Sequence, residues 1–269
     1  MTHLTLPGPL LLVGCGNMAG AMLEGWLAAG ADPRLITVVR PSGGAPAPGI
    51  RTLTALPEEE SPALVLLGVK PQKLADIAPA LAPVLEPETV LISILAGTTL
   101  ESLRRHFPAP RTIVKAMPNL PVSLRAGVTG LHTDARSDPA AIAEVERLMR
   151  ALGHVERFED EALFGIASAL TAAAPAFLFR FIDSLAAAAQ GLGLPAEQAV
   201  RLAAAMAEGS GILAARSGST PEQLARRVAS PGGTTEAGLM VLDREGRLRS
   251  LVAETLEASR RRGQEMAGS

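Results

Sequence analysis

Several chemical groups on which binding sites often depend are scarce or missing in this sequence. The only cysteine is Cys15, which excludes an internal disulfide and a cysteine-cluster metal site and is consistent with a reducing cytoplasm. There is no tyrosine, and aromatic residues make up 3% of the chain, so we expect no surface on which nucleic-acid bases stack. The formal net charge is −2, without the basic excess that a nucleic-acid partner requires.

Histidines are few and scattered. Their spacing does not match that of metal ligands, and we expect each at the surface or in a loop. They are His3, His106, His132 and His154. The chain also lacks a nucleotide P-loop and the Ser-His-Asp order of a catalytic triad. We therefore predict no metal site.

Long hydrophobic runs are rare as well. The apolar stretch near the N-terminus follows no basic region and ends in a glycine turn, which argues against a signal peptide. Residues 162–179 carry no charge, and this length lies near the lower limit for a membrane span. However, the segment is rich in alanine, contains Pro175 and is followed by Arg180 and Asp183. We expect a helix that is buried or lies at an interface, and no membrane partner.

The first part of the chain alternates short apolar runs with helical patterns. This alternation predicts βαβ units and a mostly parallel, doubly wound sheet of the Rossmann type, with an α/β fold. Residues 42–49 are rich in Gly, Pro and Ala and indicate a loop. Strands are expected at 10–13, 35–39, 63–69, 89–95 and 111–117, with edge pieces at 128–131 and 155–158, and helices at 18–29, 72–85, 100–106 and 139–152.

After about residue 161 the strand-like runs stop and alanine-rich helical stretches follow. Thr220 before Pro221 is a typical helix start, with an N-cap and a proline at the first helical position. A thin layer of helices does not bury all its apolar faces alone, so we expect a homodimer through this half. The predicted domains are 1–160 and 161–269, with helices at 162–190, 196–216, 221–228, 234–243 and 245–265.

The N-terminal strand runs directly into a glycine turn and a helix, which is the context of a dinucleotide site. Gly14 permits the tight turn, and Gly16 has no side chain to keep a pyrophosphate from the backbone. A small residue, Ala19 or Gly20, lets the helix pack close to the strand. The N–H groups at the start of this helix attract phosphates. The predicted residues of this turn are Gly14, Gly16, Asn17, Met18 and Ala19.

The end of the second strand indicates which coenzyme is bound. Enzymes that use NAD usually carry Asp or Glu there, to bind the ribose hydroxyls. This chain has Arg40 and Ser42 instead, which are suited to a 2′-phosphate. We therefore favour NADPH and leave NADH as a possible coenzyme. The alternative is that Arg40 is merely solvated and both coenzymes are accepted.

The ends of three later strands add to this site. Lys70 is suited to a phosphate or ribose, or is simply solvated. The small residues Ala96 and Gly97 allow a flat ring to approach, and Asn119 either bonds the nicotinamide or orders nearby backbone. All follow parallel strands on the side of the glycine turn, where ligands bind in such sheets. The residues expected here are Val69, Lys70, Pro71, Ala96, Gly97 and Asn119.

In the helical half, residues 229–238 combine two glycines with two hydroxyl residues at the start of a helical pattern. Helix-start N–H groups and threonine hydroxyls form a carboxylate receptor without a basic side chain. The alternative is an ordinary helix cap. A nicotinamide carries its own hydride, so a protein that binds one need only position the acceptor and supply a proton.

Together these motifs resemble pyrroline-5-carboxylate reductase over nearly the whole chain. The resemblance implies a Rossmann domain, a helical domain that interlocks in a dimer, and in some cases assemblies of dimers. It implies reduction of L-1-pyrroline-5-carboxylate to L-proline by NAD(P)H, the last step of proline biosynthesis. It rests on the motifs Gly14-Cys15-Gly16-Asn17-Met18-Ala19, Val69-Lys70-Pro71, Ala96-Gly97, Met117-Pro118-Asn119-Leu120-Pro121 and Ser230-Pro231-Gly232-Gly233-Thr234-Thr235.

The same resemblance implies the substrate site. The family's substrate loop corresponds to Val228–Thr235, with the substrate carboxylate at backbone N–H groups near Ser230, Gly233 and Thr234. Thr235 corresponds to the hydroxyl beside the imine nitrogen. The substrate residues implied are Val228, Ser230, Gly232, Gly233 and Thr234, together with Thr171.

One segment departs from the family, which usually has Ser-Gly-Ser-Gly-Pro-Ala-Tyr at the head of the long helix. Here residues 171–177 read Thr-Ala-Ala-Ala-Pro-Ala-Phe, so that Thr171 keeps one hydroxyl and the added methyl groups narrow the space. Two alternatives therefore stay open. One is an NADP-dependent reductase of another small cyclic imine or keto acid. The other is a non-catalytic dimer that responds to dinucleotides.

Overall fold

The computed structural model describes residues 3–57 and 61–267. The chain divides into two compact units, which are considered separately. The first, here called the sheet unit, comprises Met1–Ala173 and Ser259–Ser269. The second, the helical unit, comprises Ala174–Ala258. The sheet unit therefore extends beyond residue 160. The predicted domain boundary between residues 160 and 161 stays a proposal.

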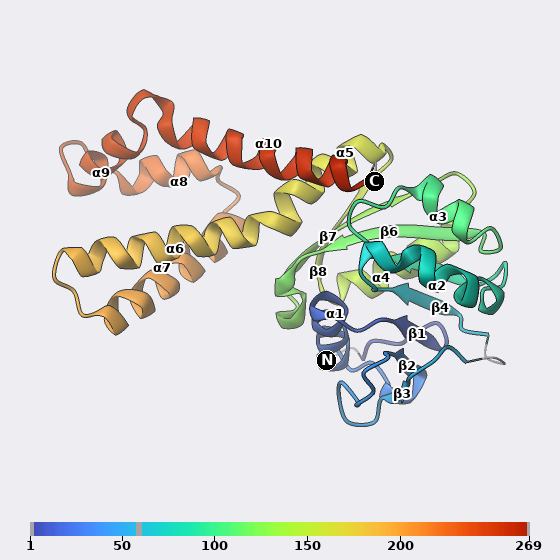
Figure 1. Ribbon diagram of the computed structural model, residues 1–269. Coiled ribbons are helices and arrows are strands. Elements are labelled where there is room, and N and C mark those ends of the chain that lie inside the picture. Colours follow the sequence, from blue (N-terminus) through green and yellow to red (C-terminus); the bar gives the residue numbers. More distant parts are fainter. Residues whose placement is uncertain (1–2, 58–60, 268–269) are drawn as a thin grey trace. The chain divides into compact units, whose positions relative to one another are not determined.

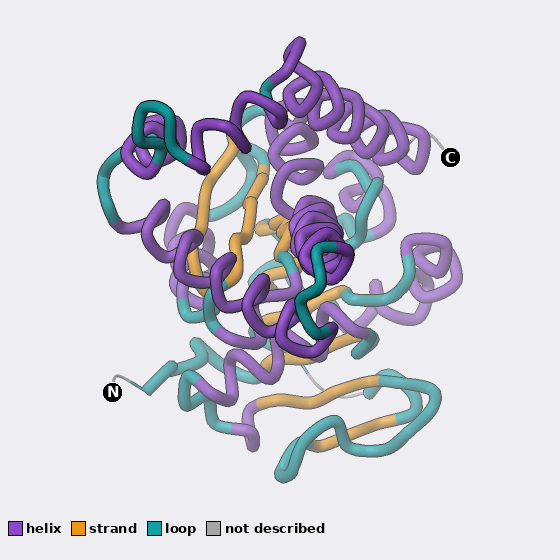
Figure 2. Tube along the Cα trace, turned by 90° about the vertical axis from the view of Figure 1, so that its left-hand side faces the viewer, coloured by secondary structure: helices purple, strands orange, loops and turns teal. Residues whose placement is uncertain are grey.

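Within the described residues the sheet unit contains eight strands in the order β3-β2-β1-β4-β5-β6-β7-β8 (Figure 1; strands are orange in Figure 2). All neighbours are parallel except β6 and β7. The predicted doubly wound, mostly parallel sheet is confirmed. The strands are β1 (Leu10–Val13), β2 (Ile36–Val39), β3 (Arg51–Leu53), β4 (Leu64–Leu67), β5 (Val90–Ser93), β6 (Thr112–Pro118), β7 (Gly127–Thr133) and β8 (Gly153–Phe158).

Strand β3 was not expected from the sequence. It has three residues, none fully buried, and it pairs with one neighbour only, at the edge of the sheet. A short edge strand needs no apolar run, so hydrophobic periodicity does not reveal it. Residues 42–49 form the expected loop between β2 and β3.

Helices cover both faces of the sheet, and the alternation of side chains along β1 shows why. Leu10 and Leu12 face one hydrophobic cluster, which includes Trp26 of α1, whereas Leu11 and Val13 face another. Successive strand side chains point to opposite faces, so an apolar run such as 10–13 is buried on both. The flanking helices are α1 (Asn17–Ala28) and α4 (Pro139–Arg150) on the first face, and α2 (Leu74–Leu81) and α3 (Leu100–His106) on the second.

Several short 3₁₀ segments complete the sheet unit. Prolines account for part of this pattern, because they start a helical turn easily but donate no hydrogen bond. The helix expected at 72–85 is thereby divided into η2, α2 and η3. The segments are η1 (Pro33–Leu35), η2 (Pro71–Lys73), η3 (Ala82–Val84) and η4 (Leu120–Leu124).

The remainder is helical, as predicted. The long stretch expected at 162–190 is interrupted by a π segment, η5, between α5 and α6. Thr220 caps α8 as expected, and it forms a capping box with Gln223. The elements are α5 (Glu161–Ser168), η5 (Ala169–Ala173), α6 (Ala174–Gly191), α7 (Ala196–Arg216), α8 (Pro221–Val228), α9 (Thr234–Leu242), η6 (Arg244–Gly246) and α10 (Arg247–Ala267).

Much apolar surface of the helical unit is exposed. Its buried cluster consists of small side chains, Ala186, Ala199 and Ala203. The helix from Glu161 to Gly191 is long and apolar enough to cross a membrane by length and composition, although a single such helix is weak evidence of a span. Only 11% of its apolar window is buried. Of the two alternatives expected for this segment, burial within the chain is not observed, and a place at an interface stays a prediction.

The expectation that every histidine lies at the surface or in a loop is also wrong. His132 is buried in β7, where its Nδ1 lies 2.9 Å from the carbonyl oxygen of Phe158 and its ring lies 5.9 Å from the ring of Phe164, centre to centre, in a tilted arrangement. A hydrogen bond to the backbone compensates for the burial of the ring. His154 is exposed but belongs to β8 rather than to a loop.

Helix α1 packs closely at two small residues. Ala19 is buried, and a β-carbon built on Gly68 would lie 3.0 Å from its Cβ, so that α1 packs closely against the segment that follows β4. Gly25 is tighter still, because an added β-carbon would overlap the carbonyl oxygen of Val122 and lie 2.6 Å from Leu152 Cδ2. Gly20, by contrast, has room for a methyl group.

We expect Gly25→Ala to lower the free energy of unfolding by about 1–3 kcal/mol, since overpacking outweighs the better helix propensity of alanine. The matched variant Gly20→Ala should leave stability unchanged or raise it by up to about 1 kcal/mol. Urea unfolding at fixed protein concentration measures both. A Gly25→Ala protein as stable as Gly20→Ala would refute the close contact with Val122.

Candidate functional site

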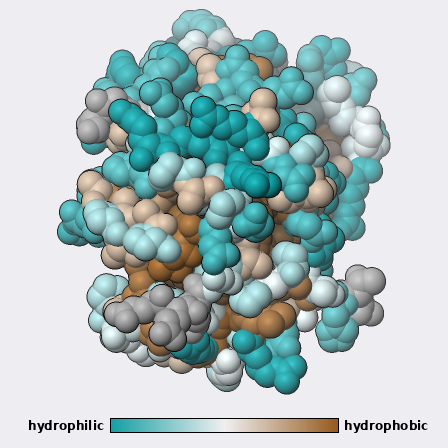
Figure 3. All heavy atoms as spheres, turned by 90° about the vertical axis from the view of Figure 1, so that its right-hand side faces the viewer, coloured by the Kyte–Doolittle hydropathy of each residue, from teal (hydrophilic) through white to brown (hydrophobic). Residues whose placement is uncertain are grey.

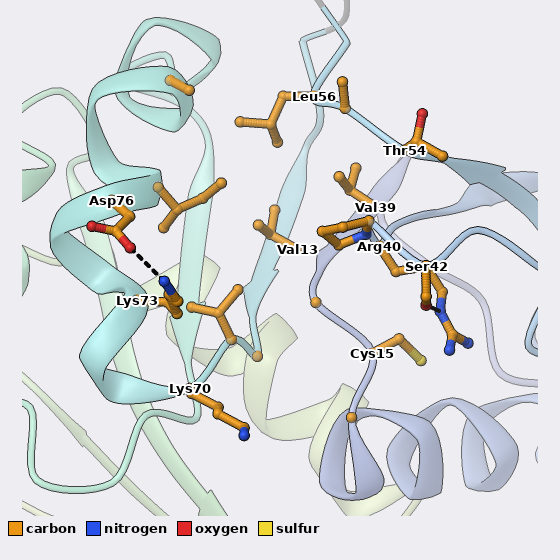
Figure 4. A pocket seen from close by; sticks show the side chains of 18 of the residues that line it. Val13, Cys15, Val39, Arg40, Ser42, Thr54, Leu56, Lys70, Lys73 and Asp76 are labelled. Carbon is orange, nitrogen blue, oxygen red and sulfur yellow. Dashed lines mark hydrogen bonds and ion pairs between the residues drawn. The ribbon is translucent and has the colours of Figure 1, made fainter.

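A cavity of about 970 Å³ lies at the carboxyl ends of the strands (Figure 4). It is lined by the residues that follow β1, β2, β3 and β4, together with part of α2. The order of the strands reverses beside β1, which pairs with β2 on one side and β4 on the other. In open α/β sheets such a reversal creates the crevice in which ligands bind.

The glycine turn gives this cavity a backbone floor. Gly14 has a φ of 85°, and a β-carbon there would lie 3.0 Å from the backbone of Gly68. A β-carbon on Gly16 would meet no atom within 4 Å, so this residue borders open space. No side chain caps the start of α1 at Asn17. The first-turn N–H groups, which include those of Asn17 and Met18, are thus suited to a phosphate, and the turn fits a dinucleotide.

The charged side chains of the cavity are mostly basic. Arg40 directly follows β2, and its Nε donates a hydrogen bond of 3.0 Å to Ser42 Oγ. Lys70 is exposed after β4, and Lys73 pairs with Asp76 at 2.8 Å. Figure 4 shows Arg40 beside Ser42 on one side and Lys70 on the other. Three cations against one carboxylate favour a ligand that carries phosphates.

Cys15 lies in the glycine turn and is half-buried. Burial raises the pKa of its thiol, and the charge of Arg40 opposes this rise only in part. The side chain therefore stays a neutral thiol near pH 7. It contributes a small, uncharged wall to the phosphate end of the cavity.

Apolar side chains form the rest of the cavity wall, and sequence reasoning missed most of them. Leu56 comes from the loop after β3, and Ile77 and Val84 come from α2 and η3. Apolar surface, in brown, is exposed among hydrophilic residues in Figure 3, on the side where α2 lies in Figure 1. Because β3 was not predicted, nothing in the sequence placed Leu56 at the end of a strand beside Arg40.

A second cavity, of about 460 Å³, lies within the sheet unit near the ends of β5 and β6. The loop residues Ala96 and Gly97 border it on one side and the π segment η5 on another. Gly97 has a φ of 72°, and a β-carbon there would approach Met266 at the end of α10 to 2.8 Å. The expected ring-contacting residues thus lie at a real cavity.

An ion pair stands at this second cavity, between the largely buried Lys115 and the partly exposed Glu161. Lys115 Nζ donates to Glu161 Oε1, and the same oxygen accepts the N–H of Leu100 at 3.0 Å. The Nζ atom also lies 4.9 Å from the centre of the Phe164 ring. Burial acts to raise the pKa of Glu161, but the hydrogen bond and charge of Lys115, with the Leu100 amide, outweigh it and hold the pKa below its ordinary value. The pair ties β6 to the starts of α3 and α5.

Asn119 is buried and is committed to backbone partners. Its Oδ1 accepts the N–H of Val128 at 2.8 Å, and its Nδ2 donates to the carbonyl oxygen of Thr171 at 3.1 Å. The Thr171 hydroxyl in turn donates to the carbonyl of Ala167 at 2.9 Å. Of the two roles expected for Asn119, the ordering of backbone is observed, and a contact with the nicotinamide stays a prediction.

The loop from Val228 to Thr235 belongs to the helical unit. Gly232 has a φ of 72°, and its N–H donates to the carboxylate of Glu236 at 2.7 Å. Gly233 precedes α9, whose first turn has no side-chain cap, and both Thr234 and Thr235 are exposed. The N–H of Gly232 is thus taken up by the chain's own Glu236, and the N–H of Gly233 donates to the carbonyl of Ser230 at 2.9 Å. Within residues 3–57 and 61–267, no cluster of three or more metal-ligating side chains occurs.

Comparisons with known proteins show two family models and several full-length relatives of one family. Residues 161–266 match the family model for pyrroline-5-carboxylate reductase dimerisation, and residues 10–97 match that for coenzyme F420-dependent NADP oxidoreductases. A pyrroline-5-carboxylate reductase of Pseudomonas aeruginosa is 34% identical, over 96% of each chain. That of Escherichia coli is 31% identical, over 96% of this chain and 97% of the relative. The structure of a pyrroline-5-carboxylate reductase from Coxiella burnetii has a TM-score of 0.85 and 31% identity, over 97% of this chain and 98% of that one.

The Lys115–Glu161 pair leads to a prediction about acid stability. Because the pKa of Glu161 is lowered by folding, its ionised form stabilises the fold fully above the carboxyl pKa of the unfolded chain. This stabilisation is lost as the pH falls through the lower pKa of the folded state. Because solvent screens this partly exposed carboxylate, Glu161→Gln should cost only about 0.5–1.5 kcal/mol at neutral pH and should flatten stability in this acidic range.

Glu144 provides the matched control, because its ion pair with Arg147 is exposed on α4. Glu144→Gln should change the free energy of unfolding by less than about 1 kcal/mol. Urea unfolding between neutral and acidic pH measures both variants. If Glu161→Gln retained the acid dependence of the parent protein, the proposed stabilisation by Glu161 would be refuted.

Proposed function

Because the chain belongs to the pyrroline-5-carboxylate reductase family, we propose specific roles for its residues in the reaction of that family. The protein is an NAD(P)H-dependent reductase that converts L-1-pyrroline-5-carboxylate to L-proline, the last step of proline biosynthesis. One observation supports the assignment of roles best. The glycine turn offers uncapped N–H groups beside a basic cavity at the carboxyl ends of the strands.

The sheet unit binds the coenzyme, and NADPH is preferred. Arg40 and Ser42 bind the 2′-phosphate, and the turn from Gly14 to Ala19 binds the pyrophosphate. Val69, Lys70 and Pro71 contact the neighbouring phosphate and ribose. Their common position at the carboxyl ends of β1, β2 and β4 supports this arrangement. So does the match of residues 10–97 to an NADP-dependent family.

The nicotinamide ring lies at Ala96 and Gly97, with Asn119 nearby. When bound, the reduced coenzyme supplies the hydride. The chain itself need only hold the acceptor carbon in line with the hydride and keep the imine nitrogen protonated. Protonation of the nitrogen makes that carbon more electrophilic. Such positioning supplies a large part of the rate in reactions between two bound molecules.

The loop from Val228 to Thr235 binds the substrate. The N–H groups near Ser230, Gly233 and Thr234 bind its carboxylate, and the left-handed backbone of Gly232 gives the turn its shape. Thr235 is the catalytic residue, because its hydroxyl accepts a hydrogen bond from the protonated imine nitrogen and relays the proton. Thr171 provides a second hydroxyl on the substrate side.

We also propose that the protein is a cytoplasmic homodimer or an assembly of dimers, formed through residues 161–269. The matched dimerisation family supports this, because it covers residues 161–266. Large apolar side chains are exposed along the same helices, as an interface requires. They include Leu178, Phe179, Leu202, Met206, Met240 and Leu251. Residues 1–160 then form the dinucleotide-binding domain.

An assay of NADPH oxidation with L-1-pyrroline-5-carboxylate beside related cyclic imines and keto acids tests the function. We expect this imine to be reduced with the highest kcat/KM. Preference for another imine would point to a substrate pocket changed by residues 171–177. Binding of NADPH without turnover of any imine would indicate a non-catalytic protein.

Arg40→Ala should raise the KM and the Kd for NADPH by about 10- to 100-fold, since a hydrogen bond to a charged group contributes roughly 1.5–3 kcal/mol. The values for NADH should change little. Arg34→Ala removes the same charge outside this cavity, from a surface pair with Asp32, and should affect neither coenzyme. Equal losses for NADPH and NADH in Arg40→Ala would contradict a contact with the 2′-phosphate.

Thr235→Ala should lower kcat/KM by about one to two powers of ten, because the bond to the charged imine nitrogen is lost. Thr235→Ser keeps the hydroxyl and should recover most of the activity. The Kd for NADPH should stay unchanged in both variants. Steady-state kinetics with the imine and fluorescence titration with NADPH provide these values, and unaltered kinetics of Thr235→Ala would remove Thr235 from the mechanism.

A further inference from the structure

The long helix that starts at Glu161 changes its hydrogen-bonding pattern at one place. It is α-helical over Glu161–Ser168, forms a π segment over Ala169–Ala173, and is α-helical again from Ala174. Pro175 lies at the second position after this segment. A proline has no N–H, so the α-helical hydrogen bond from residue 175 to the carbonyl of Thr171 does not form.

Asn119 supplies a donor to this carbonyl. Its Nδ2 lies 3.1 Å from Thr171 O, while its Oδ1 accepts the N–H of Val128 at 2.8 Å. The residue is only 6% exposed, so both bonds are shielded from water. One side chain thus joins the end of β6, the start of β7 and the π segment.

The π segment also forms a wall of the second cavity. Ala169, Ala172 and Ala173 line it, as do Ala96 and Gly97. Alanine side chains have no polar group and no rotatable bond beyond Cβ, so the path of the backbone alone determines the shape of this wall. An anchor on the backbone at Thr171 therefore controls how closely the wall approaches a bound ring.

We propose that Asn119 is a positioning residue, which replaces the N–H that Pro175 lacks and so holds the π segment in the geometry that the reaction requires. The proposal rests on the proposed function, which places the nicotinamide ring at Ala96 and Gly97. It does not require Asn119 to touch coenzyme or substrate. Its specific consequence is that Asn119 and Pro175 are energetically coupled through one carbonyl oxygen.

The test is a double-mutant cycle with the full-length protein. Asn119→Asp keeps the acceptor for Val128 and replaces the donor to Thr171, and Pro175→Ala returns a helical N–H to the same carbonyl. Two readouts are combined: hydrogen–deuterium exchange of a peptide covering residues 167–177, and kcat with a separately measured Kd for NADPH. A peptide from β1 reports whether the sheet remains folded.

We expect Asn119→Asp to increase exchange in the 167–177 peptide and to lower kcat about tenfold, with the Kd for NADPH changed by less than about twofold. Pro175→Ala alone should change kcat little. The double variant should recover protection from exchange and bring kcat to within about threefold of the parent. Pro79→Ala removes another helix-interior proline, in α2, and should not rescue Asn119→Asp.

If Pro175→Ala does not restore protection from exchange in the Asn119→Asp protein, the proposal is overturned. A large rise in the Kd for NADPH in Asn119→Asp that Pro175→Ala does not correct would overturn it as well, because such a rise would indicate direct contact between Asn119 and the coenzyme. If Asn119→Asp does not fold, the same cycle with Asn119→Ala tests the proposal. Pro175→Ala should then still recover the share of protection and of kcat that was lost with the hydrogen bond to the Thr171 carbonyl. Coupled exchange with unchanged kcat would overturn the positioning role. Absence of imine reduction by the parent protein would instead refute the proposed function, with the coupling in exchange intact.

Discussion

The reversal of strand order beside β1 is the constraint on which the coenzyme side of this structure depends. Because β2 and β4 pair with β1 on its two opposite sides, the chain segments that follow these strands diverge and leave a crevice between them. Gly14 and Gly68 approach each other there too closely for a side chain at either residue. The start of α1, Arg40 and Lys70 all reach the crevice from strand ends, so the sheet itself brings them together.

Both proposed anion sites rely on main-chain N–H groups more than on paired charges. At the glycine turn, Gly14 and Gly16 line the cavity directly before the uncapped start of α1, and the basic residues stand around it. At the Gly232 turn, the carboxylate of Glu236 already accepts one N–H. Main-chain donors are held by the fold and pay little conformational entropy when an anion binds, whereas a long basic side chain must be ordered first. The low aromatic content and modest net charge of the chain are compatible with this kind of recognition.

The second cavity is organised by two polar connections that cross the sheet unit. Glu161 joins Lys115 to the start of α3, directly after the loop that carries Ala96 and Gly97. Asn119 joins the end of β6 and the start of β7 to Thr171. Both connections are partly buried, and hydrogen bonds there are stronger and their loss more costly than at the open surface. The walls of this cavity are therefore held by neighbouring groups, although most of their own side chains are small and apolar.

The sequence by itself determined the features that depend on local chemistry. The glycine turn, the sheet with flanking helices, the boundaries of α3, the capped start of α8 and the loop before Thr234 all follow from periodicity, glycines and capping residues within short windows. Only the tertiary structure decided the rest. Strand β3 forms because it pairs with β2 at the edge of the sheet. His132 can be buried because its ring nitrogen bonds to a backbone carbonyl of β8. Asn119 meets Thr171 across 52 residues of sequence, and Lys115 meets Glu161 across 46. Such pairs depend on the packing of elements that are distant in the sequence, so no local sequence pattern predicts them.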